Sequence, residues 1–210
     1  MRNTGKIAYL FTLNFALSIS CQASPQQAKS SEQSLDLTVG VENWAGVSRT
    51  MLTSAEKAAG NVFRRVGIEV TWREISAASP PTAGAGATLL LRISRSKDFG
   101  YPEPSLGFNR PRGPNDVRAV VFIDRVELLA RRSNARLDAG AVLGCAMAHE
   151  LGHLLLGSEH SSEGIMRPAW NSKDVRSAAR EELRFTARQR KALREELYRQ
   201  TSHARSAQFR

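Results

Sequence analysis

The chain has 210 residues, of which 41% are hydrophobic and 24% are charged. This composition is typical of a globular protein and excludes a fibrous or largely disordered one, and the length fits a single domain. The formal net charge is +10, and arginine is most frequent between residues 173 and 210. Acidic residues alternate with those arginines at helical spacing, which favours a solvated helix face over a nucleic-acid site. We therefore predict no specific nucleic-acid partner.

The first 23 residues have the order of a secretory signal peptide. Basic residues precede an apolar run from Ile7 to Ile19, and small residues follow up to Ala23. The run is shorter than the roughly 20 apolar residues that cross a bilayer, so we expect export and cleavage rather than a membrane span. A lipid anchor on Cys21 is the less favoured alternative, because Ser18 stands where such sites usually carry leucine.

The chain is accordingly divided into a signal peptide (1–23), a polar spacer (24–34) and one folded domain (35–210). The domain is expected to be secreted or periplasmic, and monomeric. If Cys21 leaves with the signal peptide, Cys145 is the remaining thiol and no internal disulfide forms. We interpret Cys145 as a small buried residue rather than as a metal ligand.

The folded domain begins with a strand and a helix. Apolar and polar residues alternate over residues 35–42, a period of two that predicts a half-buried strand. Apolar residues then recur every three or four positions over residues 54–66, which predicts a helix that Gly67 ends. Two further strands are predicted at 68–75 and 87–93, after which the fold reads strand, helix, strand, strand.

A long loop separates these elements from the next ones. Residues 94–116 are rich in glycine and proline, which leaves room for only a short strand at 106–109. An unbroken apolar run then predicts a buried strand at 119–123. Asp138 is a suitable N-cap for the helix that follows.

The C-terminal region predicts one more helix. Thr186 and Gln189 are spaced as in a capping box, and the helix is expected to run to about Tyr198. Leu193 and Leu197 lie four residues apart on it and are expected to face the core.

Two histidines on the helix after Asp138 are spaced for a metal ion. His149 and His153 are four residues apart, so their side chains lie about 40° apart around the helix and reach one ion. Glu150 is rotated by about 100° from His149, which is too far for a ligand and close enough to contact a water on the metal. The pattern predicts two zinc ligands and a general base.

A third ligand is expected after the helix ends at Gly157, where a residue without a Cβ permits a sharp turn. That turn would bring His160 to the metal and leave the fourth position for water, as catalytic zinc sites require. Three of the four histidines fall within residues 149–160, which supports this assignment. Glu181 or Glu182 is the alternative third ligand.

The segment from His149 to His160, followed by Gly164-Ile165-Met166-Arg167-Pro168, resembles the metzincin zinc peptidases, the matrixin-like members most closely. The resemblance implies an α+β zincin fold with a mixed twisted sheet, a long active-site helix, a Met-turn and a C-terminal helix. It also implies that His149, His153 and His160 bind one zinc ion and that Glu150 is the base. Gly157 would be the turn glycine and Met166 the methionine of the Met-turn.

The sequence departs from the family pattern at one place. Gly157 follows His153 by four residues where the family has three, so Leu154-Leu155-Leu156 contains one extra residue. Either a local bulge or an additional helical residue would absorb it. The position of the third ligand depends on which of the two occurs.

The function implied by the resemblance is hydrolysis of peptide bonds in a protein or peptide substrate that lies extended along the edge strand at 106–109. Zinc would lower the pKa of its water to roughly 7, and Glu150 would take the proton. The alternatives are an inactive, exported zinc-binding recognition module and a basic surface-binding module with a structural metal. A base beside an open metal position favours the enzyme. The sequence assigns no structural calcium.

Overall fold

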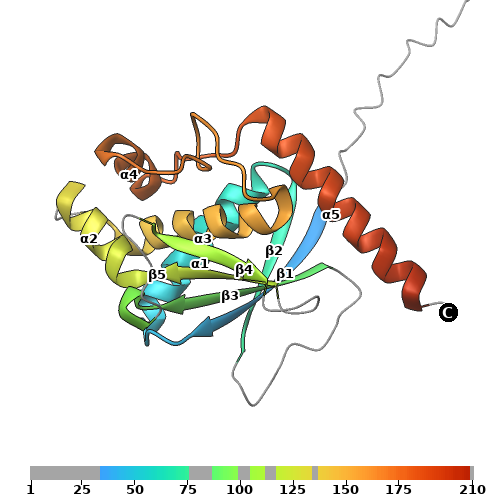
Figure 1. The fold of residues 1–210 in the computed structure, drawn as a ribbon, viewed down its shortest axis with the longest axis horizontal. Coiled ribbons are helices and arrows are strands. Elements are labelled where there is room, and N and C mark those ends of the chain that lie inside the picture. Colours follow the sequence, from blue (N-terminus) through green and yellow to red (C-terminus); the bar gives the residue numbers. More distant parts are fainter. Residues whose placement is uncertain (1–33, 76–86, 99–104, 112–116, 134–136, 209–210) are drawn as a thin grey trace, which may run out of the picture. The chain divides into compact units, whose positions relative to one another are not determined.

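A computed structural model of the chain describes residues 34–75, 87–98, 105–111, 117–133 and 137–208 (Figure 1). The predicted signal peptide (1–23) and nearly all of the predicted spacer (24–34) lie outside the described residues. All described residues belong to one compact unit, Glu32–Arg210.

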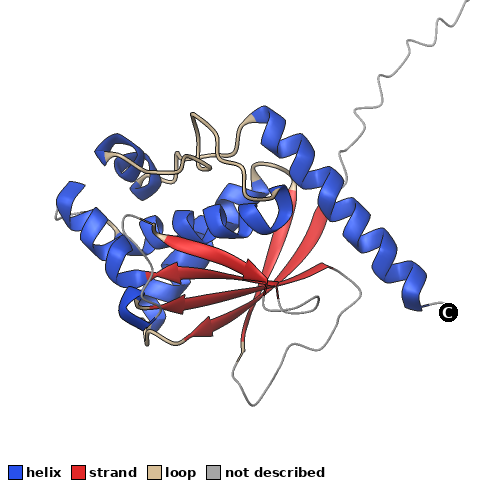
Figure 2. Ribbon diagram, viewed as in Figure 1, coloured by secondary structure: helices blue, strands red, loops and turns tan. Residues whose placement is uncertain are grey.

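Five strands form one mixed sheet in the order β2-β1-β3-β5-β4 (Figure 2). Four of them are parallel: β1 (Leu35–Asn43), β2 (Ile68–Glu74), β3 (Ala87–Ser94) and β5 (Val117–Phe122). The fifth, β4 (Gly107–Pro111), pairs antiparallel with β5 and ends the strand order. A 3₁₀ turn, η1 (Ser96–Asp98), follows β3. The mixed sheet predicted from the sequence is confirmed, although the short edge strand predicted at 106–109 begins one residue later and ends two residues later.

The two faces of β1 carry different side chains. Its alternate apolar residues are fully buried in the core: Leu37, Val39 and Val41. On the other face, Glu42 accepts hydrogen bonds from Arg92 of β3 (2.6 Å) and Arg118 of β5 (2.7 Å). Charge-assisted bonds of this kind are stronger than neutral ones, so they fasten three neighbouring strands on the polar face.

Helix α1 (Arg49–Arg64) confirms the predicted helix but begins earlier. Its N-cap is Ser48, whose Oγ accepts a hydrogen bond from the backbone N–H of Met51 (3.2 Å). The apolar periodicity becomes regular only near Ser54, so the pattern alone missed the first turn. After the helix, Gly67 has a φ of 77°, which a residue without a Cβ adopts readily.

Helix α3 (Ala139–Leu156) is the central helix of the core and packs most extensively on α1 (Figure 1). Asp138 is its N-cap, as predicted, and accepts a hydrogen bond from the backbone N–H of Gly140 (2.8 Å). Every residue from Gly140 to Gly152 is buried. Among the described residues, only α3 is long and apolar enough to cross a membrane, and most of it is buried inside this fold.

Two helices have no counterpart in the prediction: α2 (Ile123–Ser133) and α4 (Ser172–Ala179). The strand predicted at 119–123 is wrong at its last residue, because Ile123 begins α2 directly after β5. Its buried side chain extends the apolar run of the strand, which hides the boundary. Helix α4 begins with a capping box between Asn171 and Asp174.

Helix α5 (Ala187–Gln208) confirms the predicted C-terminal helix and continues well beyond Tyr198. The capping box is present: the Thr186 N–H donates to Gln189 Oε1 (2.9 Å), and the Gln189 N–H donates to Thr186 Oγ1 (3.3 Å). Leu193 and Leu197 are fully buried, as their spacing predicted.

The close approach of α1 and α3 depends on a glycine. A Cβ at Gly144 would lie 2.3 Å from the backbone oxygen of Ala55 and 2.7 Å from the Cβ of Ala58. We expect Gly144→Ala to lower the free energy of unfolding by about 1–3 kcal/mol, because the helices would have to separate. Urea unfolding followed by circular dichroism measures this.

Gly60 of α1 provides the matched control. It is also a buried helical glycine, but a Cβ there would meet only Trp72 Nε1, at an ordinary 3.7 Å. Gly60→Ala is expected to raise the free energy of unfolding by about 0.5–1 kcal/mol through helix propensity. Equal effects of the two substitutions would contradict the packing argument.

Candidate metal centre

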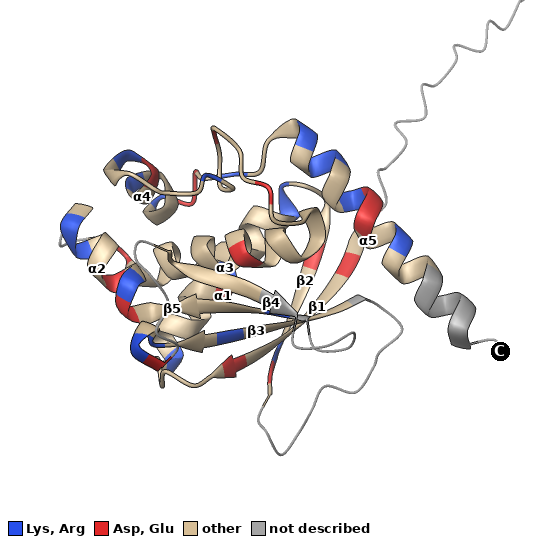
Figure 3. Cartoon of the chain, viewed as in Figure 1, with Lys and Arg blue, Asp and Glu red and all other residues tan. Residues whose placement is uncertain are grey.

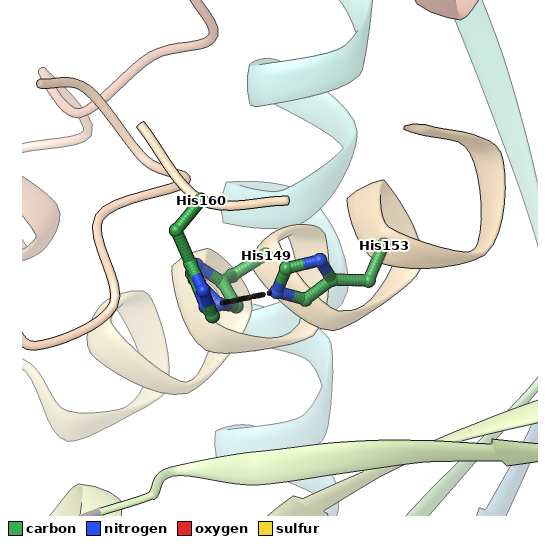
Figure 4. Close-up of side chains that lie close together, drawn as sticks. All are labelled: His149, His153 and His160. Carbon is green, nitrogen blue, oxygen red and sulfur yellow. Dashed lines mark hydrogen bonds between the residues drawn. The ribbon is translucent and has the colours of Figure 1, made fainter. Parts of the chain in front are cut away.

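Helix α3 places two imidazole rings on the same side of its last turns. The Nε2 atoms of His149 and His153 are 3.1 Å apart, as their spacing of four residues predicted (Figure 4). His149 is buried, with 8% of its surface exposed, whereas His153 is half-buried. The pair therefore lies at the boundary between the core and an open cavity.

The extra residue of the sequence motif is accommodated as an additional helical residue. Helix α3 runs through Leu156, and the N–H of Gly157 donates to the carbonyl of His153 (3.0 Å), a regular α-helical bond. Gly157 has a φ of 86° and ends the helix, as predicted. The chain then reverses and brings His160 back to the helix.

His160 completes a group of three histidines. Its Nε2 lies 3.2 Å from the Nε2 of His153 (Figure 4). The nitrogens that His149, His153 and His160 offer to a metal all lie within 4.8 Å of one another. His160 is exposed, so the group is open on that side.

Backbone carbonyls determine which nitrogen of each helical histidine carries the proton. His149 Nδ1 is 2.7 Å from the carbonyl oxygen of Ile165, and His153 Nδ1 is 2.9 Å from that of Gly157. A carbonyl only accepts, so each Nδ1 is the donor and each neutral ring presents a lone pair at Nε2. Two lone pairs 3.1 Å apart repel each other, and a shared cation removes that repulsion.

The separations fit a zinc ion. Zinc–histidine bonds of about 2.0–2.1 Å in a tetrahedron place the nitrogens about 3.3 Å apart. The observed Nε2–Nε2 distances of 3.1 and 3.2 Å agree with that value. Hydrogen bonds from the other ring nitrogen to carbonyl oxygens are also the usual outer contacts of zinc-binding histidines. The three residues therefore form a set of nitrogen donors suited to catalytic zinc.

Burial keeps the two helical histidines neutral. Desolvation lowers the pKa of His149 to about 4, against a smaller opposing effect of the hydrogen bond to Ile165. Desolvation also lowers the pKa of His153 below its ordinary value. Neutral imidazole is the form that binds metal, so the donors are available at physiological pH.

Glu150 lies beneath the edge strand β4. Only 4% of its surface is exposed, and its Oε2 accepts a hydrogen bond from Asn109 Nδ2 (2.9 Å). A Cβ at Gly107 would lie 2.8 Å from Glu150 Oε1, so this glycine allows the strand to approach the carboxyl group. Burial raises the pKa of Glu150 to about 8, and the bond from Asn109 opposes this only in part.

Met166 is fully buried beneath α3, where a Cβ at Gly152 would be 2.8 Å from its sulfur. Two backbone hydrogen bonds hold the turn that contains Met166. The Ser161 N–H donates to the Met166 carbonyl (2.9 Å), and the Ile165 N–H donates to the Arg184 carbonyl (2.8 Å). The Ile165 carbonyl in turn orients His149. The turn that contains Met166 thus contacts His149 through the Ile165 carbonyl, and its identity as the Met-turn of the resembled family stays a prediction.

Trp170 is a contributor that the sequence analysis missed. Its Nε1 donates to the Ile165 carbonyl (3.2 Å), and its ring meets the His149 ring edge-to-face at 6.0 Å. Trp170 therefore fixes the carbonyl that holds His149. The residue follows the Met-turn closely in sequence, but nothing in its local pattern distinguished it from an ordinary core tryptophan.

The alternative ligands are not part of the histidine group in the described structure. Glu181 accepts a hydrogen bond from Asn61 of α1, and Glu182 is exposed elsewhere. Cys145 is buried with its Sγ 3.7 Å from the Ala178 carbonyl, and burial raises the pKa of its thiol to about 12. The interpretation of Cys145 as a small buried residue agrees with this environment.

A cavity of about 680 Å³ opens beside the histidines. The three histidines and Glu150 line it together with Gly107, Phe108 and Asn109 of β4. Residues of helix α2 and residues 167–170, which follow Met166, also line it. A volume of this size accommodates several side chains of a peptide.

Comparison with known proteins finds no matching protein-family model and no matching curated protein. The chain is similar to several solved structures, among them two at 14% identity. Metalloproteinase-II from Bacteroides fragilis matches over 80% of this chain, which spans only 55% of that protein, with a TM-score of 0.47. Archaemetzincin from Methanopyrus kandleri matches over 79% of this chain and 96% of its own length, with a TM-score of 0.45. The matrixin-like assignment stays a prediction.

The metal-free protein should lose stability as the pH rises above 6.5. Glu150 has its pKa raised from 4.5 to about 8, so its contribution is fully present below pH 4.5 and is lost as the pH rises through 8. His149 has its pKa lowered from 6.5 to about 4, so it destabilises the fold increasingly as the pH falls from 6.5 to 4. Below pH 6.5 the two groups change the stability in opposite directions as the pH changes. Above pH 6.5 His149 is neutral in both the folded and the unfolded state, so Glu150 determines the pH dependence. Urea unfolding at pH 6.5 and 8.5 measures the loss.

Glu150→Gln is the control for this pH dependence, because glutamine preserves the shape and does not titrate. Its free energy of unfolding is expected to change little between the same two pH values. An identical decline in both proteins would assign the effect to another group.

His160 and Glu181 are distinguished by their effect on zinc binding. We expect His160→Ala to weaken zinc binding by at least about 100-fold, since losing even an outer partner of a ligand costs about 10–100-fold. Competition with a chromogenic zinc chelator at pH 7.5 measures the affinity. Glu181→Ala should bind zinc as the native protein does, and the reverse result would make Glu181 the third ligand.

Proposed function

We propose that the protein is an exported, zinc-dependent endopeptidase that hydrolyses peptide bonds in protein or peptide substrates. The observation that carries this proposal is the convergence of three imidazole Nε2 atoms beside a buried carboxyl group in an open cavity. Export is inferred from the sequence of residues 1–23, which lie outside the described structure.

In this proposal His149, His153 and His160 hold the zinc ion. When bound there, zinc supplies a Lewis acid that polarises the scissile carbonyl and makes water acidic enough to react at neutral pH. The carbonyls of Ile165 and Gly157 keep the two helical imidazoles in the tautomer that presents Nε2. The resident residues thus fix the donors before any metal arrives, which lowers the cost of binding.

Glu150 is the proposed general base. Its carboxylate takes a proton from the attacking water and later donates it to the departing amine. Glutamate acts as a base only when its carboxyl group is ionised. Burial favours the neutral carboxyl group of Glu150, whereas a nearby cation favours the ionised one. Asn109 Nδ2 holds one carboxyl oxygen in place, so the group has a defined orientation.

The edge strand β4 is the proposed support for the substrate. It is last in the strand order, and its residues Gly107 to Asn109 line the cavity next to Glu150. An extended peptide that adds to this edge would form main-chain hydrogen bonds and place a peptide bond near the histidines. This arrangement supports an endopeptidase rather than an enzyme for small molecules.

The inactive recognition module is the alternative. A structural zinc site usually has four protein ligands, whereas three donors converge in the described part of this chain. A recognition module also has no need of a buried carboxyl group held beside the metal. Both observations support the enzyme.

Removing the base tests the proposal. Glu150→Gln is expected to reduce cleavage of a quenched peptide library by at least about 10²-fold while it leaves zinc content unchanged, since positioned acid–base groups contribute about 10²–10⁴-fold. Fluorescence release and metal analysis on the same preparations provide the two readouts. Glu182→Gln is the matched control, because Glu182 is exposed and outside the cavity. Equal activity of the native protein and Glu150→Gln would rule out the proposed mechanism.

A further inference from the structure

The cavity beside the histidines has an excess of positive charge. In the described structure its lining contains three arginines, Arg125, Arg132 and Arg167, against one carboxyl group, that of Glu150. Walls of one charge sign attract ligands of the opposite sign into a cleft. The charged lining therefore favours an anionic group in the part of the cavity away from Glu150.

Two of these arginines belong to one face of α2. Arg125, Leu128, Leu129 and Arg132 all line the cavity, and their spacing places them along one side of the helix. Figure 3 shows basic residues near both ends of α2. The wall is thus apolar in the middle with a cation at each end, a surface suited to an amphipathic anion.

The three arginines differ in how far they are already engaged. Arg167 donates to both carboxylate oxygens of Asp174 (3.1 and 2.9 Å). Arg125 is buried, and its Nη1 donates to the Ser105 carbonyl (2.6 Å). Arg132 is exposed in the last turn of α2 and has no hydrogen-bond or ion-pair partner among the residues that the structure describes. Arg132 is therefore the cation best placed to bind a ligand.

We propose that this cavity binds a glutamate or aspartate side chain of the substrate close to the scissile bond, and that Arg132 binds its carboxylate. Leu128 and Leu129 contact the methylene groups of that side chain, and Arg125 and Arg167 add to the attractive field. The inference rests on the proposed peptidase function, because it concerns the same cavity. It assigns a substrate class: peptides with an acidic residue next to the cleaved bond.

Binding of labelled peptides tests the inference independently of cleavage. The probes are fluorescein-labelled octapeptides that carry glutamate, glutamine or lysine at each position that flanks the central bond. Fluorescence anisotropy with full-length Glu150→Gln protein, with and without zinc, measures Kd. We expect the best glutamate peptide to bind about tenfold more tightly than its glutamine partner, as a bond to a charged group provides, with the preference declining at high salt.

Substitutions on α2 identify the residue responsible. Arg132→Gln is expected to reduce the preference for glutamate to less than about twofold, and Arg132→Glu to shift the preference to the lysine peptides. Arg131→Gln is the matched control, because Arg131 lies on the same turn, pairs with Glu127 (3.6 Å) and does not line the cavity. It should retain the native preference.

The outcomes separate the inference from the proposed function. Cleavage of neutral peptides at native rates, with no glutamate preference and no effect of Arg132→Gln, would overturn the inference and leave the peptidase standing. A glutamate preference that depends on Arg132, in a protein that cleaves nothing, would support the binding site and remove the peptidase. Absence of any charge-dependent binding overturns the inference in either case.

Discussion

The arrangement of the site depends on one constraint: the Nε2 atoms of His149 and His153 lie 3.1 Å apart on one side of a buried helix, each with its lone pair directed outward from the ring. Helix α3 is buried on nearly all sides, so His149 has no alternative position in the core. The protons are held on Nδ1 by carbonyls from two different segments, the end of α3 and the Met-turn. The end of α3, the turn around Ile165 and Trp170 therefore all help to hold the His149 and His153 rings in place. Without a cation, the two Nε2 lone pairs repel each other.

Burial by the same surroundings gives His149 and Glu150 opposite pKa shifts. It lowers the pKa of His149 to about 4 and raises that of Glu150 to about 8, so both groups are neutral near pH 7 in the metal-free protein. Two neighbouring residues are thus uncharged in the metal-free protein, and in the proposed function a bound zinc ion would favour the ionised carboxylate. The same burial that forms the core thus sets the ionisation of the proposed base.

The local parts of this site were predictable from the sequence, and the long-range parts were not. Spacing of four residues on a helix determines how His149 and His153 meet, and Gly157 marks the helix end, so both features follow from local geometry. The pattern did not decide between a bulge and an added helical residue, because that depends on the backbone bond between Gly157 and His153. The contact of Asn109 with Glu150 joins positions 41 residues apart, and no periodicity reports such a contact.

Helix α2, one of the two helices that the sequence did not predict, contributes four residues to the lining of the cavity. Ile123 belongs to the apolar run of β5 in sequence and to α2 in the fold, so the strand passes into the helix without a loop that a pattern would detect. That direct passage places Arg125 of α2 against Ser105, just before the edge strand, and brings α2 into the lining of the same cavity as Glu150. In the proposed function the histidines and Glu150 carry out the reaction, whereas α2 supplies apolar and basic residues of the cavity lining. The residues of the proposed chemistry are thus the easiest to recognise in the sequence. The residues of the proposed substrate preference lie on a helix whose start is hidden in a strand-like run.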